Sequence, residues 1–327
     1  MLRLDESPII LFGGKGGVGK TTCACAAAVH LASRGKKTLV ISTDPAHSLG
    51  DSLGQRLGDE MTQITALPSL TALELNAAKS LREFKEEYEE EILSLLRTGS
   101  YLDDADLAEI LSLSIPGLDE VMGFKRITDL LASARADHVL IDTAPTGHAL
   151  RLLMMPELAD QWVKVLASLR WKYRRMVTQL VGGVAAERGD DFLLTLKRSV
   201  KRMRTWLRDR RRTQFVVVTI PEYLAVRETQ HLVEELRAAH VPLRHLIINH
   251  VRAGGALPCP FCAEARMAQQ PYIAALRAAY PDLAVTLMIQ EPREVRGLNA
   301  LRCVGRQLFD RLEPRGLSEH LLHAPAG

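Results

Sequence analysis

The sequence predicts an α/β fold in which helices cover both faces of a mostly parallel sheet and a helical subdomain is inserted between the strands. Three observations support this prediction. Short apolar runs recur along the chain, helical patterns separate them, and a glycine-rich segment directly follows the first run. Strands that are apolar at nearly every position are typical of parallel sheets with both faces buried.

The elements follow in order. The apolar run at residues 8–12 predicts the first buried strand, and the small residues at 22–31 predict a helix that packs closely behind it. Further strands are expected at residues 38–42, 139–141, 214–219 and 246–249. The sequence contains no internal repeat.

Two long helical segments interrupt the strand pattern. We expect residues 79–135 and 151–212 to form a helical subdomain above the carboxyl ends of the strands. Residues 1–78, 136–150 and 213–327 are expected to form the sheet domain.

Composition excludes several classes of protein. The chain has 327 residues and a net charge of +3, which is too small for its whole surface to act as a polycation. No apolar run approaches the roughly 20 residues of a membrane span, and the first residues do not resemble a signal peptide. Five cysteines make a disulfide framework improbable, so we expect a cytoplasmic protein.

The glycine-rich segment at residues 13–22 predicts a phosphate-binding loop, and therefore a P-loop NTPase sheet. In such a loop backbone N–H groups surround the phosphates, Lys20 reaches the β- and γ-oxygens, and the Thr21 hydroxyl binds Mg²⁺. A glycine turn that binds no ligand is the alternative, but strand, loop and helix occur here in the required order. The predicted nucleotide contacts are Gly14, Lys15, Gly16, Gly17, Val18, Gly19, Lys20, Thr21 and Thr22.

Lys15 is a second lysine, five positions ahead of the usual one. One lysine suffices for the phosphates of its own loop. We expect Lys15 to face outward and to meet nucleotide on a neighbouring subunit, as an arginine finger supplied in trans does. Because the chain has a single phosphate loop, this role predicts a homodimer.

Two aspartates directly follow predicted strands, Asp44 after residues 38–42 and Asp142 after residues 139–141. A carboxylate at this place can hold Mg²⁺ or orient the water that attacks the γ-phosphate. We assign Asp142 to the magnesium site and Asp44 to the water, against the alternative that both only cap helices. For the nearby His47 and His148 we favour a packing or hydrogen-bonding role over catalysis.

Three segments together resemble the loop and the two switches of the arsenite-pump/tail-anchored-protein-targeting ATPases. They are Gly-Lys-Gly-Gly-Val-Gly-Lys-Thr-Thr at 14–22, Ser-Thr-Asp-Pro-Ala-His-Ser-Leu at 42–49 and Asp-Thr-Ala-Pro-Thr-Gly-His-Ala-Leu-Arg at 142–151. The likeness covers nearly the whole chain. It also includes Ser-Ile-Pro-Gly-Leu-Asp-Glu at 114–120, Ile-Pro-Glu at 220–222 with Glu-Thr at 228–229, Asn249, Cys-Pro-Phe-Cys at 259–262 and Glu-Val-Arg-Gly-Leu at 294–298.

The resemblance implies specific roles. Lys15 would cross to the partner's nucleotide, Asp44 would position the hydrolytic water, Asp142 would belong to the magnesium shell and Asn249 would contact the adenine of ATP. Partitioning, division-site-selecting and nitrogenase iron proteins have similar loops but different switches. The last class also needs cysteines in the middle of the chain, where this sequence has none.

Cys259 and Cys262 have the spacing of two zinc ligands, whereas structural zinc takes four. A two-fold axis between two copies would complete the site with a second pair. A redox-active pair and two inert loop cysteines are the alternatives that remain. Cys23, Cys25 and Cys303 are expected to be buried in helices.

The sequence of the helical subdomain is expected to show which process ATP hydrolysis drives. An arsenite-responsive ATPase needs soft thiolate ligands, and the segment at 114–117 has serine where metalloid-responsive relatives have cysteine. We therefore favour an ATPase that captures and delivers the hydrophobic segments of tail-anchored membrane proteins, with the arsenite or antimonite pump ATPase as the alternative. Apolar residues that core packing would also explain are the candidate client contacts: Met154, Met155, Leu158, Trp162 and Leu166.

Basic residues gather at 197–212 and again at 170–175. Such runs are either solvated helix faces or surfaces for an anionic membrane or a ribosome. A membrane receptor or a pump subunit is a further expected partner. A partitioning-type ATPase that binds DNA nonspecifically through the basic run is a distant alternative, and sequence-specific nucleic-acid binding is not expected.

Overall fold

A computed structural model describes residues 7–44, 48–76, 79–80, 82–83, 86, 118–133, 135–143, 164, 188–253 and 259–309. The chain divides into two compact units. The first comprises Met1–Leu75, Arg135–Leu150 and Arg208–Gly327, and the second comprises Asn76–Ala134 and Arg151–Leu207. Each unit is considered by itself below.

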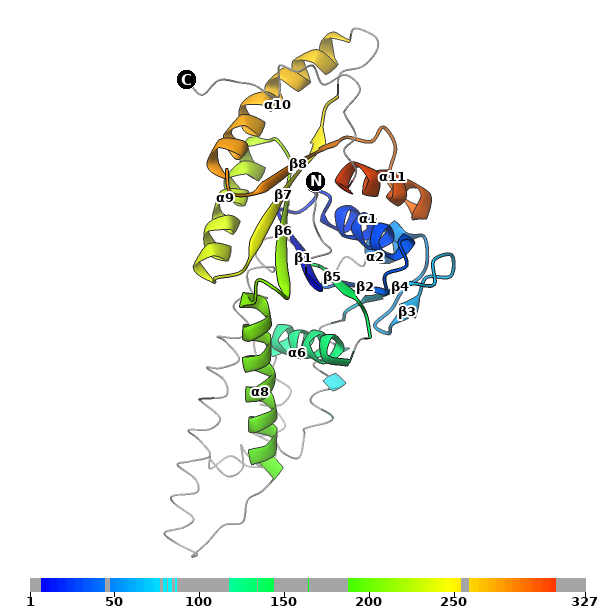
Figure 1. The fold of residues 1–327 in the computed structure, drawn as a ribbon, viewed down its shortest axis with the longest axis vertical. Coiled ribbons are helices and arrows are strands. Elements are labelled where there is room, and N and C mark those ends of the chain that lie inside the picture. Colours follow the sequence, from blue (N-terminus) through cyan, green and yellow to red (C-terminus); the bar gives the residue numbers. More distant parts are fainter. Residues whose placement is uncertain are drawn as a thin grey trace, which may run out of the picture. The chain divides into compact units, whose positions relative to one another are not determined.

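The first unit is built on a sheet whose strand order is β3-β4-β2-β5-β1-β6-β7-β8 (Figure 1). Every pair of neighbouring strands is parallel except β3 and β4. The strands are β1 Ile9–Gly13, β2 Thr38–Ser42, β3 Thr62–Gln63, β4 Leu70–Glu74, β5 His138–Asp142, β6 Thr213–Thr219, β7 Leu243–Val251 and β8 Ala284–Ile289. The predicted α/β class with a mostly parallel sheet is confirmed.

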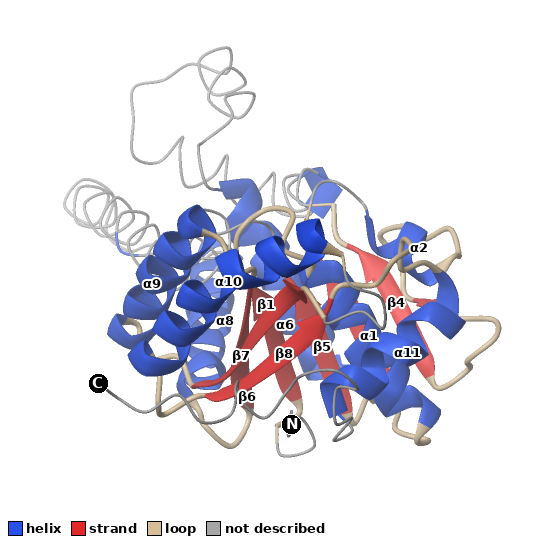
Figure 2. Ribbon diagram, turned by 90° about the horizontal axis from the view of Figure 1, so that it is seen from above, coloured by secondary structure: helices blue, strands red, loops and turns tan. Residues whose placement is uncertain are grey.

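Helices cover both faces of this sheet (Figure 2). On one face α1 (Lys20–Ser33), α2 (Ser48–Leu53) and α11 (Gly297–Phe309) pack against one another. On the other face α9 (Tyr223–Ala238) packs on β6 and β7, and α10 (Pro260–Ala279) packs beside α9. Strands β1, β2, β5 and β6 are buried at every position.

Helix α1 lies close to the sheet because its inner face consists of small residues. Residues 23–28 of this helix, which are alanines and cysteines, have no exposed surface. Close approach continues at α11, where a Cβ added to Gly305 would lie 3.2 Å from the Ala26 carbonyl oxygen. Small side chains thus bring α1, and the loop that precedes it, into a fixed position above the strands.

Three strands were not predicted from the sequence. Strand β4 (Leu-Thr-Ala-Leu-Glu) consists mainly of residues that favour helices, and pairing with β2 makes it a strand. Strand β3 has only two residues, too few for a periodic pattern. Strand β8 (Ala-Val-Thr-Leu-Met-Ile) borders the sheet beyond β7 and is only partly buried; its apolar run was an available signal that was not used.

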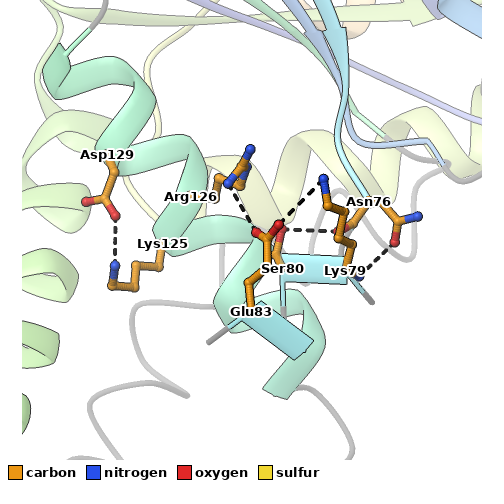
Figure 3. Close-up of polar contacts among 7 residues, drawn as sticks. All are labelled: Asn76, Lys79, Ser80, Glu83, Lys125, Arg126 and Asp129. Atoms are coloured by element: carbon orange, nitrogen blue, oxygen red, sulfur yellow. Dashed lines mark hydrogen bonds and ion pairs between the residues drawn. The ribbon is translucent and has the colours of Figure 1, made fainter. Parts of the chain in front are cut away.

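The second unit contains α6 (Leu118–Ser133) and most of α8 (Arg188–Arg208). The Asn76 side chain accepts a hydrogen bond from the Lys79 backbone N–H at 2.9 Å, which is the geometry of a helix N-cap (Figure 3). Glu83 then forms ion pairs with Lys79 at 3.5 Å and with Arg126 of α6 at 3.3 Å. These contacts tie the segment that begins at Asn76 to α6.

Helix α8 has a sharply two-sided character. Met203 and Leu207 are buried, and Thr128 of α6 donates a hydrogen bond to the Met203 sulfur at 3.6 Å. The basic side chains of this stretch are exposed: Lys197, Arg198, Lys201, Arg202, Arg204, Arg208, Arg210, Arg211 and Arg212. Exposure agrees with a solvated face and with a binding surface, so both interpretations stay open.

Several residues singled out by the sequence lie outside the described residues. They are His47, His148, the serine segment at 114–117, the basic cluster at 170–175 and the client candidates Met154, Met155, Leu158, Trp162 and Leu166. Among the helices that are described, none has the length and apolar character needed to cross a membrane.

Candidate nucleotide site

The site lies where the carboxyl ends of β1, β2 and β5 meet. In the register of these parallel strands Asp142 lies opposite Phe12 on one side and opposite Ser42 on the other. The backbone continues this alignment, since Thr43 N–H donates to the Asp142 carbonyl at 2.9 Å and Thr143 N–H donates to the Phe12 carbonyl at 3.1 Å. Three strands therefore deliver their last residues to one row.

Glycine is required at two positions of the loop. Gly14 has φ +153, and a Cβ there would collide with the Val218 carbonyl oxygen of β6. Gly19 has φ +91, and a Cβ there would collide with the side-chain amide of Asn249. The loop is therefore pressed against β6 and against the end of β7, which brings its backbone N–H groups close to any bound ligand.

The first turn of α1 is suited to an anion. Its N-cap, Gly19, provides no side-chain cap, and the first turn contains no acidic residue. The free backbone N–H groups of a helix N-terminus and the helix dipole both favour phosphate. The loop delivers Lys20 as the first residue of this helix.

Lys20 is held inside the loop. Its ammonium group donates a hydrogen bond to the Lys15 carbonyl at 3.1 Å, and only 5% of the residue is exposed. Burial lowers the pKa of Lys20, and the nearby carboxylates of Asp142 and Asp44 act in the opposite direction. A partly desolvated ammonium group gains strongly from a phosphate partner, because burial has already removed most of its water.

Asp142 and Thr21 form the next part of the site. The Thr21 hydroxyl donates to Asp142 Oδ2 at 2.7 Å, and the Ser42 hydroxyl donates to the same oxygen at 3.4 Å. The Ser48 hydroxyl lies 3.3 Å from that of Thr21. Helices α1 and α2 and strand β2 thus place three hydroxyls beside the carboxylate at the end of strand β5.

The pKa of Asp142 is raised to about 6, chiefly by burial, while the hydrogen bond from Thr21 and the charge of Lys20 lower it. Its Oδ1 atom is buried and has no hydrogen-bond partner within the described part of the chain. A buried carboxylate oxygen beside two hydroxyls matches the oxygen ligands that Mg²⁺ prefers. The residues present therefore fit a magnesium ion held by Thr21 and Asp142.

Asp44 borders the same site and is partly buried. Its backbone N–H donates to the Ser42 hydroxyl at 3.2 Å, so Ser42 links it to Asp142. Its charge influences the pKa of both Lys20 and Asp142. The carboxylate therefore lies in the electrostatic field of the proposed phosphate site, and its action on a water molecule stays a prediction.

Asn249 reaches the loop from β7. Its side-chain amide donates to the Val18 carbonyl at 2.9 Å, and only 6% of the residue is exposed. The contact joins residues that are 231 positions apart in the sequence. The predicted contact with adenine is not tested by this geometry, although the residue does border the loop.

Lys15 differs from Lys20 in its surroundings. Its ammonium group forms an ion pair with Glu228 of α9 at 3.3 Å, and the two side chains are 32% and 41% exposed. The lysine is therefore turned away from the interior of its own loop. Whether it reaches a second subunit stays a prediction.

The two exposed cysteines of the Cys259–Cys262 pair lie at the start of α10. Cys259 is the N-cap, its sulfur accepts a hydrogen bond from Cys262 N–H at 3.5 Å, and this bond lowers the pKa of the Cys259 thiol. No group of three or more potential metal ligands occurs in the described ranges of this single chain. Zinc binding is therefore not shown.

The burial of the other three cysteines agrees only in part with the prediction. Cys23 and Cys25 are buried in α1, as expected, but Cys303 is exposed on α11. The prediction for Cys303 was wrong because α11 buries only one side. Leu301, Val304 and Leu308 face the core.

Sequence reasoning did not identify Ser42, Ser48 and Glu228 as site residues. The two serines belong to the segment at 42–49 that was recognised, and their position between a strand end and a helix start was an available signal. Glu228 belongs to a segment that carries the family likeness, but its contact with Lys15 was not predicted, because it arises only through the packing of α9 on the sheet.

Comparison with known proteins agrees with this geometry. A model of the family described as anion-transporting ATPase matches residues 7–310. ATPase ASNA1 homolog 1 of Paramecium tetraurelia is 33% identical over 301 residues, which cover 90% of this chain and 89% of the relative. ATPase get3 of Schizosaccharomyces pombe is 32% identical over 303 residues, covering 91% and 90%. ATPase GET3B of Arabidopsis thaliana is 35% identical over 317 residues, covering 90% and 77%.

Proposed function

Because this chain belongs to the anion-transporting ATPase family, we propose that it uses ATP hydrolysis to capture and deliver the hydrophobic segments of tail-anchored membrane proteins. Membership makes the chain an ATP hydrolase. The process that ATP hydrolysis drives is the part that we propose, and this proposal rests on the sequence motifs described above.

The contact between Thr21 and Asp142 is the observation that supports the hydrolytic site best. It brings a loop hydroxyl and a strand-end carboxylate to 2.7 Å of each other, beside the buried ammonium group of Lys20. Lys20 and the N-terminus of α1 would bind the phosphates of ATP, and Thr21 and Asp142 would hold Mg²⁺. The ion would neutralise charge on the phosphates during transfer to water.

Asp44 is proposed to orient the attacking water. It follows β2 by two residues, and the hydrogen bond from its backbone N–H to the Ser42 hydroxyl holds its backbone beside the site. A carboxylate that accepts a hydrogen bond from water aligns it for in-line attack on the γ-phosphate.

A homodimer is proposed to complete the site. Lys15 already lies on the outer side of the loop, and an ion pair between partly exposed groups is weak enough to exchange partners. Cys259 and Cys262 would supply half of a zinc site, and the same two residues of a second copy would supply the rest.

Replacing both cysteines by serine tests this part. We expect the variant to lose bound zinc, measured by metal analysis of the purified protein, and to shift from dimer to monomer in light scattering. The matched control is Cys303→Ser, which removes another exposed thiol far along the chain and should keep both metal and dimer. A metal-free double variant that stays fully dimeric contradicts the zinc bridge.

The proposed client is favoured over a metalloid by a compositional observation. The chain has no cysteine between Cys25 and Cys259, so the helical segments contain no soft thiolate for As(III) or Sb(III). They do contain apolar residues, including the client candidates from Met154 to Leu166, whose surroundings are not described.

One experiment separates the two functions. The chain is co-expressed with a protein that carries a single C-terminal membrane helix, and the ATPase rate of the purified chain is measured with and without antimonite. Co-purification of the helix protein together with an unchanged ATPase rate is the expected result. A many-fold stimulation by antimonite without any co-purification would refute the targeting function.

A further inference from the structure

A cavity of about 710 Å³ opens in the first unit at the amino ends of β6, β7 and β8. The phosphate loop follows the carboxyl end of β1, which runs parallel to β6, so the cavity lies at the other end of these strands. Its volume is in the range of small-molecule sites, which is about 300–1,000 Å³. The lining residues are Arg208, Arg210, Arg237, His240, Val241, Pro242, Leu243, Arg244, His245, Asp282 and Ala284.

The charge of this lining is strongly positive. Four arginines contribute to it against a single aspartate, and two histidines add further N–H groups. The chain as a whole has a net charge of only +3, so this concentration is a local feature. Like charges placed together repel one another, and an anion between them would relieve the repulsion.

Backbone carbonyls orient two of these arginines. Arg208 Nε donates to the Ala239 carbonyl at 3.2 Å, and an Arg244 side-chain N–H donates to the Arg210 carbonyl at 3.0 Å. A carbonyl fixes the direction of a guanidinium group through one of its five N–H donors, and both arginines have further interactions besides these bonds.

The single acidic residue of the lining is already engaged. An Arg237 side-chain nitrogen lies 2.9 Å from each carboxylate oxygen of Asp282, and the Arg237 guanidinium also lies over the Tyr280 ring at 5.6 Å. By contrast, the guanidinium of Arg210 has no hydrogen-bond or ion-pair partner within the described residues. Arg210 is therefore the lining arginine with the most donors available to a ligand.

His240 adds a further polar side chain to the lining. The end of α9 forms a Schellman motif, in which Val241 N–H donates to the Leu236 carbonyl at 2.9 Å and His240 N–H donates to the Arg237 carbonyl at 3.0 Å. The residue at His240 has φ +59, a conformation for which glycine is the usual choice. A histidine here places an additional donor at the cavity despite the cost of a left-handed backbone.

We propose that this cavity binds a small soluble anion that carries several phosphate groups. The planar fork of arginine matches the oxygens of phosphate, and several arginines in one place favour a ligand with several negative charges over a single carboxylate. The cavity is concave, which suits a free molecule better than the surface of a membrane. The site is separate from the ATP site, so the same unit would bind a second anionic ligand in addition to the nucleotide.

Calorimetric titration with sodium tripolyphosphate tests the proposal on the full-length chain. ADP is present in excess to fill the phosphate loop, and magnesium is omitted because tripolyphosphate chelates it. We expect one tripolyphosphate per chain, no displacement of a fluorescent ADP analogue, and an affinity that falls as salt is added.

The comparison of two neighbouring arginines makes the test specific. Arg210→Gln removes a lining guanidinium and should weaken binding by about 10- to 100-fold. Arg211→Gln removes another exposed charge, one that does not line the cavity, and should leave the affinity within about 2-fold. Both variants should keep the parental melting temperature, because neither side chain is buried.

Three results would overturn the proposal. One is equal weakening by the two variants, which would mean nonspecific attraction. Another is release of the ADP analogue in proportion to bound tripolyphosphate, which would place binding in the phosphate loop. The third is retention of the chain by phosphatidylglycerol vesicles together with no tripolyphosphate binding, which would indicate a membrane surface.

Discussion

The two lysines of the phosphate loop lie in opposite environments. Lys20 is 5% exposed, donates to a backbone carbonyl and lies in the field of two carboxylates. Lys15 is 32% exposed and pairs with one side chain of α9. The inner part of the loop is thus fixed by burial within its own chain, whereas the outer part is held by an interaction that solvent screens.

This difference predicts that substitutions at the inner part of the loop have larger effects than substitutions at the outer part. At the inner part, each polar group is shared with residues from β2, β5 or β7, so a change disturbs several contacts at once. At the outer part, a change removes one weak pair and leaves the fold intact. The predictions below test this contrast, beginning with the largest expected effect.

Asp44→Asn should slow ATP hydrolysis by about 10²- to 10⁴-fold, because the carboxylate proposed to orient water loses its charge. ATP affinity should change little, since the loop and Lys20 are untouched. Single-turnover hydrolysis and fluorescent nucleotide binding measure the two quantities. The control is Asp51→Asn, an exposed aspartate of α2 that lies 3.6 Å from Arg296, and parental turnover in both variants would remove Asp44 from the mechanism.

Asp142→Asn should stabilise the nucleotide-free protein above about pH 6. The folded-state pKa of Asp142 is raised from 3.8 to about 6, so its contribution to stability falls as pH rises between these values. A shift of this size corresponds to about 3 kcal/mol of destabilisation by the ionised group at higher pH.

Denaturant unfolding at about pH 8 and about pH 4 should therefore show a gain for the asparagine variant only at the higher pH. The same variant should lose the extra stability that Mg²⁺ adds in the presence of ATP, because it lacks the carboxylate. If the substitution changed the free energy of unfolding equally at both pH values, ionisation of the buried Asp142 side chain would not destabilise the fold.

Gly19→Ala should destabilise the protein by about 1–3 kcal/mol and weaken nucleotide binding, because the new Cβ meets the Asn249 amide in a left-handed backbone. Gly35→Ala is the control, since Gly35 has φ +78 but no atom within 4 Å of a Cβ. The excess loss in Gly19→Ala measures the collision with Asn249. Adding Asn249→Ala should recover part of it, and no recovery would show that backbone strain alone is responsible.

Glu228→Gln should have the smallest effect, about 0.2–1 kcal/mol on unfolding, because the ion pair with Lys15 is partly exposed. Turnover should be kept or rise slightly, since Lys15 is released from its partner in the same chain. Lys15→Ala in parallel should reduce turnover if the lysine acts on a second subunit. A loss of several kcal/mol in Glu228→Gln would show that the outer part of the loop is as firmly held as the inner part.

Much of the central fold could be predicted because its signals are local. The five predicted strands are present as β1, β2, β5, β6 and β7, and the small-residue helix is present as α1. A buried parallel strand is nearly all apolar, and a phosphate loop has a glycine pattern that few other structures require. Strand β4 was missed because its residues favour helices and only pairing with β2 makes it extended.

The amino-acid sequence by itself determined the phosphate loop, the strand-end aspartates and the class of fold, because each depends on residues that are neighbours in the chain. Tertiary structure alone decided that Asn249 supports Val18, that Glu228 holds Lys15 and that Cys303 faces solvent. It also gathered the arginines of the basic cavity from the ends of α8 and α9 and the starts of β6 and β7. These contacts join segments far apart in sequence, and only the packing of helices on the sheet brings them together.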